Sequence, residues 1–117
     1  MPAQTDKLAI MFADISGSTA LYEKLGDQVA RQLIARCLTI LNGALATHQG
    51  TLIKTIGDEI LCTFPTVEYA LNAACEMQLA LKIDNQHSEH QMFVRIGFHY
   101  GGVIYEEGDI YGDAVNV

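Results

Sequence analysis

The sequence predicts an α+β domain of the ferredoxin-like, split βαβ type, with an antiparallel sheet and its helices on one face. Three observations predict this fold. Short apolar runs and amphipathic segments follow the order strand, helix, helix, strand, strand, helix, strand. Only three residues separate two of the apolar runs, as in a hairpin. The 117 residues, half of them hydrophobic, are enough for one domain with a modest core.

Each predicted element has a recognised boundary signal. Small hydroxyl or acidic residues begin helices and glycines end them, while apolar runs without helical spacing are assigned to strands. In chain order we expect a strand over Lys7 to Ala13, a short helix from Ser18 or Thr19 to Gly26, a longer helix from Asp27 to about His48 that Gly50 closes, strands over Thr51 to Ile56 and Ile60 to Phe64, a helix from Pro65 and Thr66 to about Ile83, a loop over Asp84 to Gln91, and a strand over Met92 to Tyr100.

Two aspartates at strand ends are the candidate metal ligands. Asp14 directly follows the first strand, and Asp58 lies in the turn before the third. Either one alone is more typical of a turn or a helix cap. In the split βαβ plan, however, the first and third strands are antiparallel neighbours, so the two carboxylates are predicted to meet. Neighbouring carboxylates need cations, and oxygen ligands suit Mg²⁺ or Mn²⁺.

The segment after Asp14 is a candidate phosphate site because it opens a helix with small residues. The first amides of a helix have no partner within the helix and can face an anion. With two metal ions, such an arrangement suits phosphoryl transfer. The residues whose amides would hold phosphate oxygens are Ile15, Ser16, Gly17, Ser18 and Thr19.

Composition excludes several classes of function. A net charge of -7 with seven Lys and Arg offers no basic stripe, so binding to nucleic-acid polymers is disfavoured. No apolar run approaches the length of a membrane span, and the first residues lack the features of a signal peptide. Cys37, Cys62 and Cys75 show no zinc-site spacing and are predicted to be buried thiols in a reducing cytoplasm.

Across its whole length, 1–117, the chain resembles the class III adenylate and guanylate cyclase catalytic domain. Four landmarks occur in the order typical of that family, which makes chance agreement improbable. They are Phe12-Ala13-Asp14-Ile15-Ser16-Gly17-Ser18-Thr19, Lys54-Thr55-Ile56-Gly57-Asp58-Glu59, Arg95-Ile96-Gly97-Phe98-His99-Tyr100-Gly101, and Gly108-Asp109-Ile110-Tyr111-Gly112-Asp113-Ala114-Val115-Asn116-Val117.

The resemblance implies a role for each site residue. Asp14 and Asp58 would be the carboxylate ligands of two metal ions, with the carbonyl of Ile15 as an additional ligand. Lys54 and Asp109 would read the base, and a Lys donor with an Asp acceptor suits adenine, so the implied substrate is ATP. The implied product is cyclic AMP.

A last catalytic residue, Asn116, would position the ribose and stabilise the reacting centre. The family also implies a head-to-tail homodimer in which one chain supplies the metal half of a site and its partner supplies the base half. One departure is that the family's transition-state Arg, four residues after the Asn, is absent because the chain ends at Val117. We therefore expect a C-terminally truncated cyclase domain that folds but is catalytically silent.

Other interpretations of these patterns remain open. The fold could serve as a noncatalytic nucleotide-binding or dimerising regulatory module. A diguanylate-type cyclase would need a second glycine before Gly57, where Ile56 stands. The segment from Glu106 to Asp109 could be only a solvated hairpin turn. Lys54 could be only a charge that guards a sheet edge.

The remaining polar residues are assigned structural roles. His87 and His90 are expected to be solvated loop residues, and His99 a hydrogen-bonded strand residue. Glu59 could be a third ligand, but strand alternation is expected to turn it away from Asp58.

Overall fold

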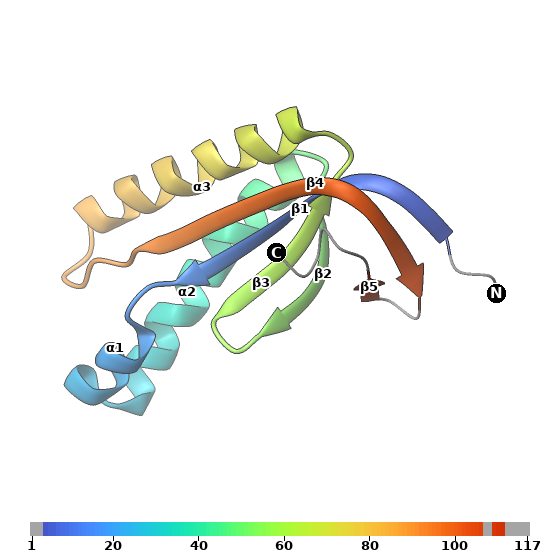
Figure 1. Cartoon of the computed structure of the whole chain (residues 1–117). Helices are drawn as coiled ribbons and strands as arrows, with labels where there is room; N and C mark the ends of the chain where they lie inside the picture. The colour runs from blue at the N-terminus through green and yellow to red at the C-terminus, as the bar shows by residue number, and fades with distance from the viewer. Residues whose placement is uncertain (1–3, 107–108, 112–117) are drawn as a thin grey trace.

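The structure is a computed structural model that describes residues 4–106 and 109–111 of the chain. The predicted order of helices and strands is confirmed, and a short fifth strand follows the fourth. The elements are β1 (Gln4–Ile15), α1 (Ser18–Leu25), α2 (Asp27–Thr47), β2 (Thr51–Ile56), β3 (Glu59–Phe64), α3 (Val67–Gln86), β4 (Val94–Glu106) and β5 (Asp109–Tyr111) (Figure 1).

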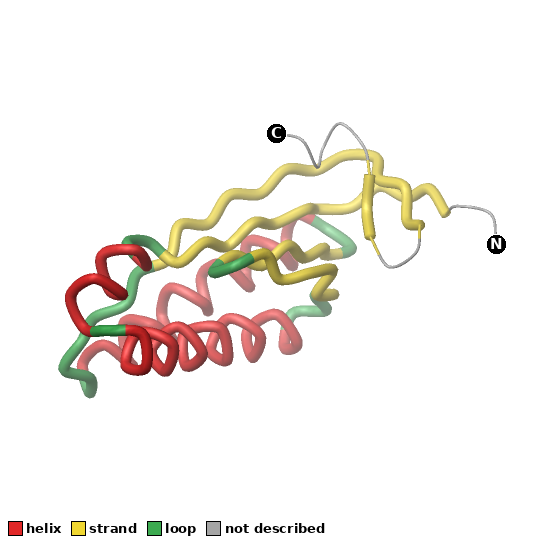
Figure 2. Tube along the Cα trace, turned by 90° about the horizontal axis from the view of Figure 1, so that it is seen from below, coloured by secondary structure: helices red, strands yellow, loops and turns green. Residues whose placement is uncertain are grey.

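The sheet has the order β2-β3-β1-β4-β5, and all of its neighbouring strands are antiparallel. The first strand therefore lies at the centre with the third beside it, as the split βαβ plan predicts. Figure 2 shows the helices on one side of the sheet. The predicted fold class is confirmed.

The side chains of β1 alternate between the two faces of the sheet, and each face has its own apolar cluster. Ala9, Met11, Ala13 and Ile15 face the helices, because residues two apart on a strand share a face. They join the main core with buried residues of α2 and α3, which include Cys37, Leu41, Ala70, Ala73, Met77 and Leu81. The other face of β1 belongs to a smaller cluster, so the sheet carries a covered face and a more open one.

The end of β4 carries β5 across part of this open face. In Figure 1 the strand bends strongly beyond its middle and brings β5 toward β2, although these two strands lie at opposite edges of the sheet. Ile110 is buried against Ile10 and Leu61, which anchors the bend with apolar contacts. Glu106 pairs with Asp109, so β4 and β5 are antiparallel neighbours.

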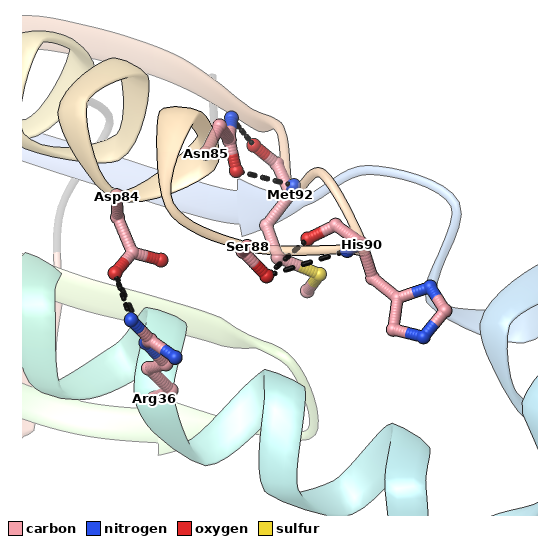
Figure 3. Close-up of polar contacts among 6 residues, drawn as sticks. All are labelled: Arg36, Asp84, Asn85, Ser88, His90 and Met92. Carbon is pink, nitrogen blue, oxygen red and sulfur yellow. Dashed lines mark hydrogen bonds and ion pairs between the residues drawn. The ribbon is translucent and has the colours of Figure 1, made fainter.

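Several predicted boundaries were wrong by a few residues. The strand β1 is longer at both ends than Lys7 to Ala13 because β4 pairs with it along twelve positions. The helix α3 continues to Gln86, three residues beyond the predicted end, and β4 begins at Val94 rather than Met92. The polar residues near this junction suggested a loop, but Asp84 accepts a hydrogen bond from Arg36 of α2 while still in the helix (Figure 3).

The helix starts also differ from the predicted caps. The N-cap of α1 is Gly17, in the left-handed region at φ 72°, and that of α2 is Gly26, so Ser18 and Asp27 are the first helical residues. The start of α3 is confirmed, because the hydroxyl of Thr66 accepts a hydrogen bond from the amide of Tyr69 at 3.2 Å.

Gly50 closes the turn after α2, as predicted, for a steric reason. A Cβ atom there would lie 2.7 Å from both Leu45 Cγ and Phe64 Cε2, closer than side-chain carbons approach one another. Both neighbours belong to the main core, so a larger residue would displace buried side chains.

The prediction of three buried cysteines holds for two of them. Burial raises the pKa of the Cys37 thiol to about 11 and that of Cys62 to about 12, so both stay protonated. Cys75 is exposed, and for it the prediction was wrong. It lies four residues from both Leu71 and Leu79, which are also exposed, so this stripe of α3 faces away from the sheet.

Candidate active site

The backbone segments that carry the two candidate metal aspartates adjoin, at the end of β1 and in the turn between β2 and β3. The amide of Ile15 donates a hydrogen bond to the carbonyl oxygen of Asp58 at 3.1 Å. Asp14 is thus one residue from a direct backbone link to the β2–β3 turn. That turn is tight, with Gly57 in the left-handed region at φ 57°, and it projects Asp58 from the end of the hairpin.

Arg95 forms an ion pair with Asp14 that the sequence analysis did not identify. A guanidinium nitrogen lies 3.0 Å from Asp14 Oδ2, and the Arg95 side chain is 79% exposed. The two residues are directly opposite in the β1–β4 register, so their side chains share the open face of the sheet. The sequence analysis named Arg95 only within one of the segments that carry the family resemblance. Knowing which residues of β1 and β4 face each other would have revealed the ion pair.

Glu59 also lies on the side of the sheet where Asp14 lies, contrary to the expectation that alternation turns it away from the site. It is the first residue of β3 and pairs directly with Asp14, whereas Asp58 precedes the strand and does not follow its alternation. Among the residues that the structure describes, no three His, Cys, Asp or Glu side chains are grouped so that they could hold a metal ion. Glu59 therefore adds negative charge near Asp14 without completing a cage.

The candidate metal donors, which are the carboxylates of Asp14 and Asp58 and the carbonyl of Ile15, are all oxygen atoms. Such hard ligands fit Mg²⁺ or Mn²⁺, ions that ordinarily keep several water or phosphate ligands. The Asp14 side chain is 36% exposed and the Arg95 side chain paired with it is 79% exposed, so a cation can reach the carboxylate.

Fewer backbone amides are available to bind phosphate than the sequence predicted. The amides of Ile15 and Ser16 already donate, the first to Asp58 and the second to the carbonyl oxygen of Phe93 at 2.8 Å. These two N–H groups are therefore engaged within the sheet. Gly17 and the first turn of α1 remain, without a side-chain cap, so the amides around Ser18 and Thr19 are the ones that can face an anion.

The two candidate base readers contact each other within one chain. Lys54 Nζ donates to Asp109 Oδ2 at 2.9 Å, although Lys54 lies on β2 and Asp109 on β5. The bend of β4 makes this contact possible. Asp109 Oδ1 also accepts from the amide of Ile110 at 2.8 Å. The hydrogen bond from Lys54, followed by that of the Ile110 amide, lowers the pKa of the Asp109 carboxyl.

The histidines do not join the candidate site. His87 is exposed at the end of α3, and the backbone of His90 is bonded to the hydroxyl of Ser88. His99 is exposed on β4, opposite Ile10. The expectation for Asn116 lies outside the described residues.

The fold is thus an antiparallel split βαβ domain with two aspartates at neighbouring strand ends and a helix start without a side-chain cap beside them. The family described as the adenylate and guanylate cyclase catalytic domain matches residues 1–117, and the chain belongs to that family. This confirms the resemblance found in the sequence.

Curated relatives and solved structures agree with this assignment. An adenylate cyclase of Streptomyces coelicolor is 32% identical over 114 residues, which is 95% of this chain and 28% of the relative. A crystal structure of an adenylate/guanylate cyclase/hydrolase from Silicibacter pomeroyi is 32% identical, with a TM-score of 0.85, over 98% of this chain and 68% of that one. A bacterial light-regulated adenylyl cyclase, 27% identical, has a TM-score of 0.92 over 100% of this chain and 39% of that one.

The chain spans only 19% to 28% of the length of the first curated relatives it matches. Within the part that the structure describes, no helix has the length and apolar character needed to cross a membrane.

Proposed function

We propose that this chain is the nucleotide- and metal-binding part of an adenylate cyclase, which converts ATP to cyclic AMP and pyrophosphate. In that reaction the 3'-hydroxyl oxygen bonds to the α-phosphorus, the bond from that phosphorus to the pyrophosphate oxygen breaks, and the hydroxyl proton is lost. The observation that carries the proposal is the backbone bond that joins the end of β1, next to Asp14, to the turn that carries Asp58, beside a helix start without a side-chain cap. Several relatives are named adenylate cyclases, which supports the same reaction.

In the metal half, Asp14, Asp58 and the Ile15 carbonyl would hold two Mg²⁺ or Mn²⁺ ions. When bound, these ions supply positive charge to the attacking and leaving oxygens. Arg95 would give up the Asp14 carboxylate when a metal ion binds there. Its exposed guanidinium would then be able to donate to a phosphate oxygen, beside the amides at the start of α1.

In the base half, Lys54 and Asp109 would select adenine. Lys54 would donate to N1 of the ring, and the Asp109 carboxylate would accept from the N6 amino group. The contact between the two side chains supports this role, because it holds a donor and an acceptor side by side before the base arrives. Guanine presents the opposite pattern at these two positions and would leave both charges unpaired.

A head-to-tail homodimer would bring the two halves of each site together. Within one chain, Figure 1 shows β5, which carries Asp109, near the end of the sheet away from α1. A second copy, turned head to tail, would place its base half against the first copy's metal half. We further propose a cytoplasmic location, which the free thiols of Cys37, Cys62 and Cys75 support.

Nucleotide binding and turnover test the proposal together. Calorimetric titration with ATP or GTP, in the presence of Mg²⁺ or Mn²⁺, should give tighter binding of ATP and none without metal. Cyclic AMP formation is then measured in this chain and in a version that continues past Val117 through the expected Arg, where activity should appear. Preference for GTP, or binding independent of metal, would contradict the proposal. ATP binding without turnover in the longer version would indicate a noncatalytic nucleotide-binding module.

A further inference from the structure

The segment that leads into β4 is fixed by three successive carbonyl groups, each bound by a different partner. The oxygen of Met92 accepts from the side-chain amide of Asn85 at 2.9 Å, that of Phe93 from the Ser16 amide at 2.8 Å, and that of Val94 from the side chain of Gln78 at 3.1 Å. Asn85 and Gln78 both lie on α3. The bond that supports Ser16 is therefore flanked by two bonds from one helix.

Asn85 holds Met92 through both of its polar atoms. Its Oδ1 accepts from the Met92 amide at 2.8 Å while its Nδ2 donates to the Met92 oxygen, so the side chain pairs with the backbone as a neighbouring strand would (Figure 3). Only a carboxamide offers a donor and an acceptor in this fork. Aspartate has the same shape but accepts only.

Side-chain burial alone does not fix the next residue. The side chain of Met92 is 4% exposed and belongs to the main core, but Phe93 is 59% exposed. Val94, on the other side, is 7% exposed and belongs to the same core, so the Phe93 carbonyl is placed both by the buried side chains of its two neighbours and by the polar bonds on either side of it. Since Ser16 immediately precedes Gly17, the N-cap of α1, the position of that carbonyl also fixes where the open helix start lies.

We propose that Asn85 is a positioning residue for the anion cradle at the start of α1. It acts through Met92 and Phe93 on Ser16, and it does not itself touch a nucleotide. The part of this inference that concerns nucleotides rests on the proposed function. Loss of the fork would let residues 92–93 shift, weaken the Ser16 bond and move the free amides out of line with bound phosphates.

Amide hydrogen exchange, followed by NMR in the 117-residue chain, tests the structural link without any nucleotide. Asn85→Ala removes both bonds, and Asn85→Asp keeps the size and the acceptor but loses the donor. Both should speed exchange of the Ser16 amide at least about tenfold relative to the amides of Ile10 and Met11 at the centre of β1. Asn72→Ala, at an exposed position of the same helix, is the matched control and should leave the ratio unchanged.

The nucleotide part is read from the dissociation constant for ATP with Mg²⁺, which should rise about tenfold in the Asn85 variants and not in Asn72→Ala. An unchanged Ser16 exchange ratio in Asn85→Asp, with the fold intact, would overturn the inference. Faster exchange with an unchanged ATP affinity would overturn the link to the cradle. If the parent chain binds no nucleotide, the proposed function fails, while the exchange ratio still decides whether Asn85 positions Ser16.

Discussion

The candidate site has a metal half, around Asp14, and a base half, around Lys54 and Asp109. In each half an aspartate forms an ion pair with a basic side chain, but the two aspartates differ in how many hydrogen bonds orient them. In the metal half, Asp14 meets an Arg95 side chain that is 79% exposed. In the base half, Lys54 is 42% exposed, and Asp109 also accepts from the backbone amide of Ile110. Solvated ion pairs contribute little and are easily replaced. Both ion pairs are solvated, but Asp109 also has a backbone donor, so its carboxylate is more firmly oriented than that of Asp14.

The largest expected effect is on the metal half. Asp14→Ala and Asp58→Ala each remove a ligand and should weaken Mn²⁺ binding, measured by electron paramagnetic resonance, by about 10²-fold or more. In a version with cyclase activity, cyclic AMP formation should fall by about 10³-fold, because the metals act directly on the reacting oxygens. Asp27→Ala, on the exposed start of α2, is the control. If both site variants bound Mn²⁺ as the parent chain does, Asp14 and Asp58 would not be metal ligands, and this part of the site would not be a metal half.

The second prediction concerns the base half. The double variant Lys54→Glu with Asp109→Cys replaces the donor and the acceptor that suit adenine. The preference for ATP over GTP should fall by about 100-fold, since mismatched polar groups at a base edge are left unpaired. Cyclic product formed from each nucleotide, or the two dissociation constants, measures the change. A constant ratio would mean that the base is recognised elsewhere.

The sequence predicted that Asp14 and Asp58 lie at neighbouring strand ends, because this proximity depends only on the order of the elements. Once the first and third strands are neighbours, the end of one must adjoin the start of the other. The Lys54 and Asp109 contact could not be derived in this way. It joins opposite edges of the sheet and requires the bend in β4, which no local pattern of residues encodes. Only the family resemblance related these two residues.

Strand register and tertiary hydrogen bonds explain two further kinds of error in the sequence-based predictions. The pairing of Arg95 and Glu59 with Asp14 follows from the residue-by-residue alignment of three strands, which a single apolar run does not fix. The extension of α3 past Ile83 depends on Arg36 of α2 and on the backbone of Met92, both distant in sequence. Where tertiary contacts satisfy polar groups, a polar stretch does not need to be a loop.

The third prediction sharpens the claim that a cation can reach the Asp14 carboxylate. Arg95→Gln removes the cation that competes for Asp14, so Mn²⁺ should bind about two- to fivefold more tightly without nucleotide, as expected for loss of an exposed ion pair. ATP should then bind more weakly, because a phosphate donor is lost. Arg31→Gln, an exposed change of equal charge on α2, corrects for net charge. Weaker Mn²⁺ binding in Arg95→Gln would show that the arginine supports the metal site and does not compete with it.

The smallest expected effect is the pH dependence of the base half. Lys54, together with the Ile110 amide, lowers the pKa of Asp109 below its ordinary value. A carboxyl whose folded pKa is lowered stabilises the fold above its unfolded pKa, and this contribution is lost as the pH falls through the folded pKa.

Lys54→Met removes the larger cause, so the pKa of Asp109 should rise toward the ordinary value, while the bond from Ile110 keeps part of the shift. Carbon NMR of the Asp109 carboxyl across an acid titration measures it, with Lys24→Met as the control on α1. If the pKa of Asp109 were the same in Lys54→Met and in the parent chain, the contact between the two side chains would not persist in solution, and the base half would be no better arranged than the metal half.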